Sequence, residues 1–414
     1  MKIQPVKGTC DYLPRQQELR DYLESVILRV YRSAGYERIS TPALEDAENI
    51  DKSDGGDNLN LIFKVLKRGE KLDAAFDAGD KAGLSDMGLR YDLTLPLSRY
   101  FACHQDKLFL PAKCIQIGRV WRAERPQKGR NREFVQCDID ILGSSSTACE
   151  VDLICTTARA LTEIGMDKFE IHISDRELLA GVLSTVGVPE EMRNTVSVSL
   201  DKLDKIGLEG VNAELTEKGL DPTVIDRLSR LMGEGEVTLE KAEEYLTDRT
   251  PAERLRSIME QVSAITDGGV RLVFDLTLIR GQGYYTGPVF EVRSTEFRGA
   301  IAGGGRYDHL IGKFIGRDVP AVGFSIGFER IFAILSERGF TPGTERKKIA
   351  LLFYPDQLTA AAKAAEELRA SADVTLIEKT GKVGKLIAKC EAYGFDALAE
   401  MTDAGVTVKD LAHA

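Results

Sequence analysis

The segment Gly118–Gly143 concentrates side chains that suit the binding of phosphate. Between positions 122 and 132 it contains five cations: Arg122, Arg125, Lys128, Arg130 and Arg132. A single carboxylate, Glu124, lies among them. Guanidinium groups can grip phosphate oxygens through two parallel hydrogen bonds, which an ammonium group cannot do. The spacing therefore indicates a phosphate-binding loop, with a solvated charged turn as the alternative.

Two largely apolar runs flank this basic segment, Ile115–Trp121 before it and Phe134–Leu142 after it. Such a pattern predicts a strand, a basic loop and a second strand, which together form a hairpin above a sheet. The second strand carries Gln136, Asp138 and Asp140 at every other position, so these three side chains share one face. Polar residues aligned on one face of an apolar strand indicate the floor of a ligand site.

The basic hairpin resembles motif 2 of the class II aminoacyl-tRNA synthetases, in the form found in the histidyl-tRNA synthetase family. Leu278–Glu291 (LIRGQGYYTGPVFE) and Ala302–Asp308 (AGGGRYD) resemble the two signatures of the histidine enzymes. Ala321–Ile331 (AVGFSIGFERI) resembles motif 3 of the class. A glycine-rich fragment such as GGGRY is common by itself. Four segments in the order of the family, across nearly the whole chain, make a specific signal.

The resemblance implies a mixed α/β fold, with an α+β catalytic core built on an antiparallel sheet flanked by helices. It also implies an enzyme, a histidine–tRNA ligase. Such an enzyme uses ATP to activate L-histidine to histidyl-adenylate, releases pyrophosphate, and transfers histidine to the 3′ end of tRNA(His). The alternative is a regulatory paralogue of ATP phosphoribosyltransferase, which binds histidine without ligase activity and typically lacks the ATP-binding arginines. The presence of Arg122, Arg280 and Arg330 favours the ligase.

The same resemblance implies roles for individual residues. Arg280 and Arg122 would be catalytic, in contact with the α-phosphate. The residues that would bind ATP are Arg122, Glu124, Arg130, Phe134 and Arg330. The residues that would bind histidine are Asp92, Thr94, Gln136, Asp140, Arg280, Tyr284 and Tyr285. The residues that would meet the tRNA acceptor end are Gln127, Lys128 and Arg130. Three assignments have plainer alternatives, because Asp92 could cap the following helix, Tyr285 could belong to the core and Arg330 could be a surface cation.

The chemistry of adenylate formation explains why arginines matter here. The attacking carboxylate is already ionised at neutral pH, so no general base is needed. Catalysis then depends on positioning and on stabilising charge on the phosphoryl oxygens. The chain has four histidines, and none lies in a nucleophile motif. In the family, the arginine at position 280 takes a role that other class II enzymes give to a metal ion. We therefore expect Mg²⁺ with the ATP phosphates and no metal site from a protein motif.

One position departs from the family pattern. The family often reads R-G-L-D-Y-Y where this chain has Gln282 and Gly283 at the middle positions. The arginine and both tyrosines of the motif are present. We therefore expect a pocket wall that differs from that of the family.

Several elements must position these side chains. The apolar stripe of Arg15–Ala34 predicts a helix, and Tyr36–Ser40 predicts a strand that stops at Thr41–Pro42. These elements resemble class II motif 1, which implies a homodimer, although an ordinary edge strand ended by a proline is the alternative. Further on, Leu61–Val65 and Leu72–Phe76 predict a hairpin.

The chain divides by texture into four parts. Residues 1–174 are expected to form the first part of the catalytic core and residues 268–340 the second part. Between them, residues 175–267 form a run of helical segments separated by glycines and acidic turns, which predicts a helical insertion. After a polar linker, residues 341–414 alternate strands and helices and resemble a shortened anticodon-binding α/β domain.

Composition narrows the class of protein. A length of 414 residues suits two or three domains. The chain has no apolar run near the roughly 20 residues that cross a bilayer, and its first residues lack the apolar core of a secretory signal. Seven scattered cysteines, without a C-x-x-C pair, indicate reduced thiols in the cytoplasm, and the adjacent Cys103 and His104 are too few for a zinc site. The net charge of −10 disfavours a nonspecific RNA-binding scaffold.

Overall fold

The computed structural model describes residues 1–51, 60–126, 130–233, 235, 237–280, 283–343, 346–380, 383–402 and 405–411. The chain forms two compact units, Met1–Phe340 and Thr341–Ala414. Within the described parts of the chain, we find no helix with both the length and the apolarity needed to cross a membrane.

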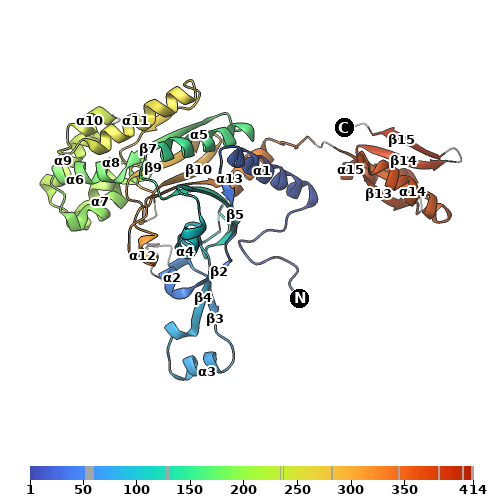
Figure 1. The fold of residues 1–414 in the computed structure, drawn as a ribbon, viewed down its shortest axis with the longest axis horizontal. Helices are drawn as coiled ribbons and strands as arrows, with labels where there is room; N and C mark the ends of the chain where they lie inside the picture. Colours follow the sequence, from blue (N-terminus) through green and yellow to red (C-terminus); the bar gives the residue numbers. More distant parts are fainter. Residues whose placement is uncertain are drawn as a thin grey trace. The chain divides into compact units, whose positions relative to one another are not determined.

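An eight-stranded sheet is the framework of the first unit (Figure 1). In spatial order its strands are β1 (Glu37–Arg38), β5 (Ala112–Trp121), β6 (Glu133–Leu142), β11 (Ala321–Gly327), β10 (Phe297–Arg306), β9 (Pro288–Ser294), β7 (Phe169–Asp175) and β8 (Leu272–Phe274). Pairing is antiparallel except between β1 and β5 and between β7 and β8. The predicted mixed α/β fold, dominated by an antiparallel sheet, is therefore confirmed.

One face of this sheet is covered by helices. They are α1 (Pro14–Ser33), α5 (Ala148–Glu163), α11 (Thr250–Ile265) and α13 (Phe328–Glu337). The alternation along β6 explains which face they cover, because Cys137, Ile139 and Ile141 are buried in one core with the apolar stripe of α1. The polar residues between them must point to the opposite face of the sheet. The sequence of β6 thus separates a packed face from a face available to ligands.

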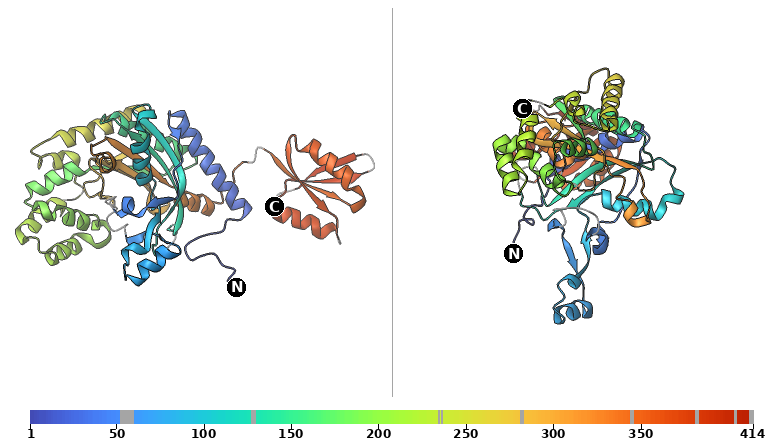
Figure 2. Two further views of the ribbon diagram at one scale, coloured as in Figure 1. Left: turned by 60° about the horizontal axis from the view of Figure 1, so that its bottom comes forward. Right: turned by 90° about the vertical axis from the view of Figure 1, so that its left-hand side faces the viewer.

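The chain leaves the sheet after β7 and returns to it at β8. The intervening helices are α6 (Arg176–Thr185), α7 (Arg193–Leu200), α8 (Leu203–Glu217), α9 (Pro222–Gly233), α10 (Leu239–Glu243) and α11. Figure 2 shows them gathered at one end of the sheet. Asp175 caps α6 by accepting hydrogen bonds from the backbone of Glu177 and Leu178, and it accepts another from Arg254 of α11 at 2.6 Å. This fully buried carboxylate therefore ties the first and last helices of the segment together.

A smaller sheet projects from the first unit (Figure 1). Its strands are β2 (Leu44–Asp46), β4 (Ser85–Leu89) and β3 (Lys64–Leu66), and α2 (Ala47–Asp51) follows β2 directly. The prediction that Leu72–Phe76 pairs with the preceding strand is wrong, because these residues belong to helix α3 (Glu70–Asp77). Gly69, at φ 59°, breaks the extended chain before the helix, and Glu70 and Asp73 lie in the first turn, where carboxylates are favourable. The strand that pairs with β3 is β4 instead.

Two short helices of the first unit remain. α4 (Thr94–His104) begins just beyond β4, and α12 (Gly312–Ile315) packs against it. α4 lies on the sheet face opposite α1 and α5 (Figure 1). Its first turn therefore reaches the face of the sheet that carries the polar side chains of β6.

The second unit has the alternation predicted from its sequence. Its elements are β12 (Lys347–Phe353), α14 (Leu358–Leu368), β13 (Ala372–Glu378), α15 (Val383–Tyr393), β14 (Ala397–Thr402) and β15 (Gly405–Asp410). The strands are ordered β13-β12-β14-β15, and all pairs are parallel except β14 with β15. The expected small α/β module with a largely parallel sheet is confirmed.

Candidate active site

A cavity of about 1090 Å³ lies over the polar face of the large sheet. It brings together every residue assigned to the site from the sequence that the structure describes: Asp92, Thr94, Arg122, Glu124, Arg130, Phe134, Gln136, Asp140, Arg280, Tyr284, Tyr285 and Arg330. Gln127, Lys128 and Gln282 lie outside the described residues. The assembled residues extend from Asp92 to Arg330 in the sequence, so the fold alone makes them neighbours.

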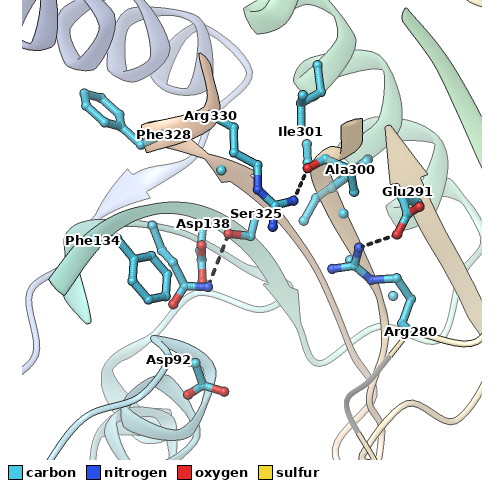
Figure 3. A pocket seen from close by; sticks show the side chains of 18 of the residues that line it. Asp92, Phe134, Asp138, Arg280, Glu291, Ala300, Ile301, Ser325, Phe328 and Arg330 are labelled. Carbon is cyan, nitrogen blue, oxygen red and sulfur yellow. Dashed lines mark hydrogen bonds and ion pairs between the residues drawn. The ribbon is translucent and has the colours of Figure 1, made fainter. Parts of the chain in front are cut away.

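Three arginines converge on this cavity from different elements. Arg122 follows β5 and donates from Nε to the backbone oxygen of Tyr91 at 2.9 Å. Arg330, in the first turn of α13, donates to the backbone oxygen of Ala300. Arg280, from the loop before β9, donates from Nη1 to Glu291 at 3.1 Å (Figure 3). Arg330 therefore bonds to a neutral carbonyl group, whereas Arg122 and Arg280 also face carboxylates, with Nη1 of Arg122 at 3.9 Å from Oε1 of Glu124.

The pKa of Arg330 reflects this concentration of charge. Burial lowers it from its usual value, and repulsion by Arg130 and Arg280 lowers it further. For Arg280, burial also acts to lower the pKa, but Tyr285 and Glu291 outweigh that effect and raise it. A half-enclosed cavity with several like charges is favourable for a polyanion, because the anion relieves the repulsion.

The floor of the cavity carries buried acidic side chains. Asp138 and Asp140 of β6 are 4% and 3% exposed. The hydroxyl of Tyr307 donates to Oδ1 of Asp140 at 2.6 Å. Burial raises the pKa of Asp140 to about 7, although the bond from Tyr307 acts to lower it. Burial and the neighbouring Asp140 raise the pKa of Asp138 well above its usual value. Protonation or deprotonation of this pair of carboxyl groups near neutral pH therefore changes the charge that a bound ligand contacts.

Three buried acceptor oxygens in the cavity have no hydrogen-bond donor among the described residues. They are Oδ2 of Asp92, Oε1 of Gln136 and Oδ1 of Asp138. The other oxygen of Asp92 accepts a hydrogen bond from the backbone of Leu95 at 3.1 Å, so Asp92 also caps the first turn of α4. Buried acceptors without donors cost free energy, and a ligand that supplies N–H groups recovers it. This floor suits an ammonium group or an imidazole.

Two glycines make room for these side chains. A Cβ atom at Gly303 would lie 2.1 Å from Nη1 of Arg280, and one at Gly323 would lie 2.0 Å from Oδ1 of Asp140. Arg280 itself has φ 59°, in the left-handed region that is costly for a residue with a side chain. The guanidinium group of Arg280 therefore occupies the space that a side chain at Gly303 of β10 would fill. The backbone of Arg280 is strained, as is common at functional sites.

The two tyrosines of the loop before β9 line the cavity and also pack. Tyr284 is 9% exposed, and its ring centroid lies 5.9 Å from that of Tyr307. Tyr285 is half-buried and contacts the same apolar cluster. Tyr285 therefore both lines the cavity and packs against the core, so the two interpretations of this residue are compatible.

Sequence reasoning left two residues of this site without a role. Tyr307 lies within the AGGGRYD signature, and its bond to Asp140 joins residues 167 positions apart. Asp138 lies on the polar face of β6, where the period-two pattern placed it. Its position between Gln136 and Asp140 was the available signal, whereas the contact of Tyr307 depends on the register between β10, β11 and β6.

An antiparallel sheet that presents arginines from a strand–loop–strand hairpin and from a strand–helix junction is the arrangement of class II aminoacyl-tRNA synthetases. A sequence profile described as histidyl-tRNA synthetase matches residues 8–331. The chain belongs to the histidyl-tRNA synthetase family.

Individual relatives agree with this assignment. The chain is 42% identical over 347 residues to a histidine–tRNA ligase from Leifsonia xyli subsp. xyli, covering 80% of each protein. It resembles the crystal structure of histidyl-tRNA synthetase from Nostoc sp. PCC 7120 with a TM-score of 0.81 at 26% identity, covering 99% and 95% of the two chains. It also resembles an ATP phosphoribosyltransferase regulatory subunit/histidyl-tRNA synthetase from Bacillus halodurans C, with a TM-score of 0.77 over 94% and 97% of the chains. The identity of that pair is 22%, so it shows the fold alone.

Proposed function

We propose that this chain carries out the reaction of its family, the ligation of histidine to tRNA(His). ATP and L-histidine form histidyl-adenylate with release of pyrophosphate, and histidine then passes to the 3′ end of the tRNA. One observation carries the proposal. A single cavity holds three arginines on one side and three unsatisfied acceptor oxygens on its floor. The first group suits a triphosphate and the second suits an amino acid with an imidazole ring.

The arginines act on the phosphates of ATP. Arg280 and Arg122 stabilise charge on the α-phosphate, and Arg330 holds the γ-phosphate region. Phe134 stacks on the adenine; its ring lies 5.3 Å from the guanidinium carbon of Arg122, which places an aromatic surface beside the phosphate site. Glu124 and Arg130 complete the ATP site, and Mg²⁺ enters with the phosphates as part of the substrate. No base is needed, because the attacking carboxylate is ionised.

The floor of the cavity selects histidine. The acceptor oxygens of Asp92 and Gln136, together with Thr94, hold the α-ammonium group. Asp140 accepts a hydrogen bond from the imidazole ring while Tyr307 orients that carboxylate, and Tyr284 and Tyr285 close the pocket beside it. A site built to satisfy substrate N–H groups rejects analogues without them by a large factor, because its own acceptors would stay unpaired.

The macromolecular partners follow from the family assignment. Gln127, Lys128 and Arg130 meet the acceptor end of the tRNA, and residues 341–414 serve as the anticodon-binding domain. We also propose a homodimer, supported by Phe109 and Leu110, whose side chains are exposed in the segment just before β5. Light scattering that finds a single chain in solution at micromolar concentration would contradict the dimer.

The test is histidine-dependent exchange of pyrophosphate into ATP, followed by charging of tRNA(His). We expect the wild-type chain to catalyse both reactions. Arg280→Ala should lower the exchange rate by about 10²–10³-fold, the usual cost of one donor to developing charge. The matched control is Arg230→Ala on α9, an exposed arginine paired with Asp226, which should leave the rate unchanged.

Two outcomes would overturn the proposal. One is a folded wild-type chain that binds histidine but catalyses no exchange with magnesium and ATP present, which would indicate the regulatory paralogue. The other is equal loss of activity in Arg280→Ala and Arg230→Ala.

A further inference from the structure

The orientation of Arg280 depends on residues outside the loop that carries it. Its guanidinium group passes over Gly303 of β10, and Gly303 is paired in register with Glu291 of β9. Glu291 therefore lies beside Gly303 on the adjacent strand. Its Oε2 accepts a hydrogen bond from Nη1 of Arg280 at 3.1 Å. Because a guanidinium group carries five N–H donors, this bond occupies only one of them.

A second arginine holds the other oxygen of Glu291. Arg293 lies two residues further along β9, so both side chains share the cavity face of the strand. Nε of Arg293 donates to Oε1 of Glu291 at 3.0 Å. Glu291 is therefore fixed from both sides by cations, with one oxygen for each.

Arg293 is in turn held by a carboxylate that is itself anchored. Its Nη2 lies 3.0 Å from Oδ2 of Asp275. Asp275 accepts two hydrogen bonds from Thr277, one from the backbone nitrogen and one from the hydroxyl. Although burial acts to raise the pKa of Asp275, the neighbouring His172, the hydrogen bonds from Thr277 and the charge of Arg293 hold it at about 2. This series of ion pairs thus ends on Asp275, a carboxylate that is hydrogen-bonded to the backbone nitrogen of Thr277.

A residue of the helical segment also reaches this series of ion pairs. Asp204 of α8 lies 3.9 Å from Nη1 of Arg293. Asp201, Asp204 and Lys205 line the same cavity as Arg280. Residues between β7 and β8 therefore contribute to the surroundings of the catalytic arginine.

We propose that Glu291 and Arg293 are positioning residues that fix the guanidinium group of Arg280 for the reaction, with Asp275 as their anchor. The proposal rests on the function proposed for this site. Neither residue needs to touch a substrate. Without Glu291, the guanidinium group of Arg280 would lose the contact that holds it over Gly303, and its strained backbone would no longer be opposed by a fixed partner. Misplacement of a charge-stabilising group by about 1 Å can cost on the order of 10²-fold in rate.

A double-mutant cycle separates positioning from a general structural effect. The wild-type chain is first shown to catalyse exchange, so failure of the proposed function is recognised before any variant is measured. We expect Glu291→Ala to lower kcat for exchange by about 10²-fold and Arg293→Ala by about 10-fold. Glu291→Gln keeps an acceptor for Arg280 and should restore part of the loss.

The decisive measurement is Glu291→Ala in the Arg280→Ala background. If Glu291 acts through Arg280, its removal there should change the rate by less than about 2-fold, since its target is already gone. Glu24→Ala on α1 is the matched control, because Glu24 is a partly exposed carboxylate that pairs with Arg38. It should leave the rate unchanged. Additive losses in the double variant, or no loss in Glu291→Ala with thermal stability retained, would overturn the proposal.

Discussion

Two sets of arginines in the first unit have opposite relations to their surroundings. Arg306 is buried with a side-chain exposure of 6%, and its Nε donates to the fully buried Glu150 at 2.6 Å. Arg20 pairs with Glu329 through two hydrogen bonds of 2.6 and 2.9 Å. By contrast, Arg330 in the cavity bonds to the backbone carbonyl group of Ala300, which carries no charge. Arg122 bonds to a backbone oxygen and has Glu124 only at 3.9 Å. The first set is neutralised inside the protein, and the second keeps its charge for a ligand.

The difference teaches that residue type and motif membership do not decide the role of an arginine. Arg306 lies in the AGGGRYD signature and Arg330 lies in the motif 3 segment. In a buried ion pair both charged groups have lost their hydration, so removal of one partner leaves the other charge buried and destabilises the fold. A cavity arginine without a counter-charge contributes little to folding and binds an anion strongly. Removing one kind should therefore damage folding, and removing the other should damage catalysis.

The largest effect is expected from Arg306→Ala. The substitution leaves Glu150 buried without its cation, which typically costs about 3–5 kcal/mol. Chemical unfolding followed by circular dichroism measures this loss directly. Replacing both partners in Arg306→Met with Glu150→Leu should recover most of the stability, because the fully buried charge is removed and Asp308, which also loses its contact with Arg306, is partly exposed. A loss below about 1 kcal/mol in the single variant would place this pair among weak surface pairs and remove the contrast.

Arg330→Ala should show the reverse pattern. We expect kcat/KM for ATP to fall by about 10²–10³-fold, the cost of losing one group that stabilises developing charge. The melting temperature should stay equal or rise, because the substitution removes the repulsion from Arg130 and Arg280. Pyrophosphate exchange and thermal unfolding on the same preparation test both statements. Strong destabilisation without a specific rise in KM for ATP would contradict the proposed division of roles.

Local patterns of the sequence predicted part of the fold that carries this site. The period-two pattern predicted the polar face of β6, and the alternation of strands and helices predicted the second unit. Apolar spacing also predicted α1. The strand assigned to Leu72–Phe76 is wrong because the effect of Gly69 and the acidic first turn outweighed a short apolar run. The correct predictions and the wrong one all depend on interactions between residues that are close in the sequence.

Contacts between distant residues could not be predicted in the same way. The pair of Arg306 with Glu150 spans 156 positions, and the bond from Tyr307 to Asp140 spans 167. Each depends on the register of several strands, which no local pattern contains. The left-handed backbone of Arg280 is likewise unexpected, since non-glycine residues rarely adopt it. The sequence predicted the residues of the proposed site, but not the residues that hold them in place.

The smallest expected effect extends the comparison from arginines to carboxylates. Glu150 has a cation as its partner, whereas Asp140 has the neutral hydroxyl of Tyr307. Asp140 has a pKa of about 7 in the folded chain, above the ordinary value of 3.8 that applies when it is unfolded. The folded chain therefore binds the proton more tightly. The stability that this proton provides is fully present below pH 3.8 and is lost as the pH rises through 7.

Asp140→Asn removes this titration, because an amide stays neutral at every pH. The free energy of unfolding of the wild type, relative to the variant, should fall between pH 5 and pH 8, by about 1.4 kcal/mol for each pKa unit crossed. Urea unfolding at the two pH values measures it, with Asp226→Asn, an exposed carboxylate on α9, as the control. If the difference between wild type and Asp140→Asn is the same at both pH values, Asp140 keeps its charge in the folded chain. The difference between Asp140 and Glu150 would then be limited to their hydrogen-bond partners.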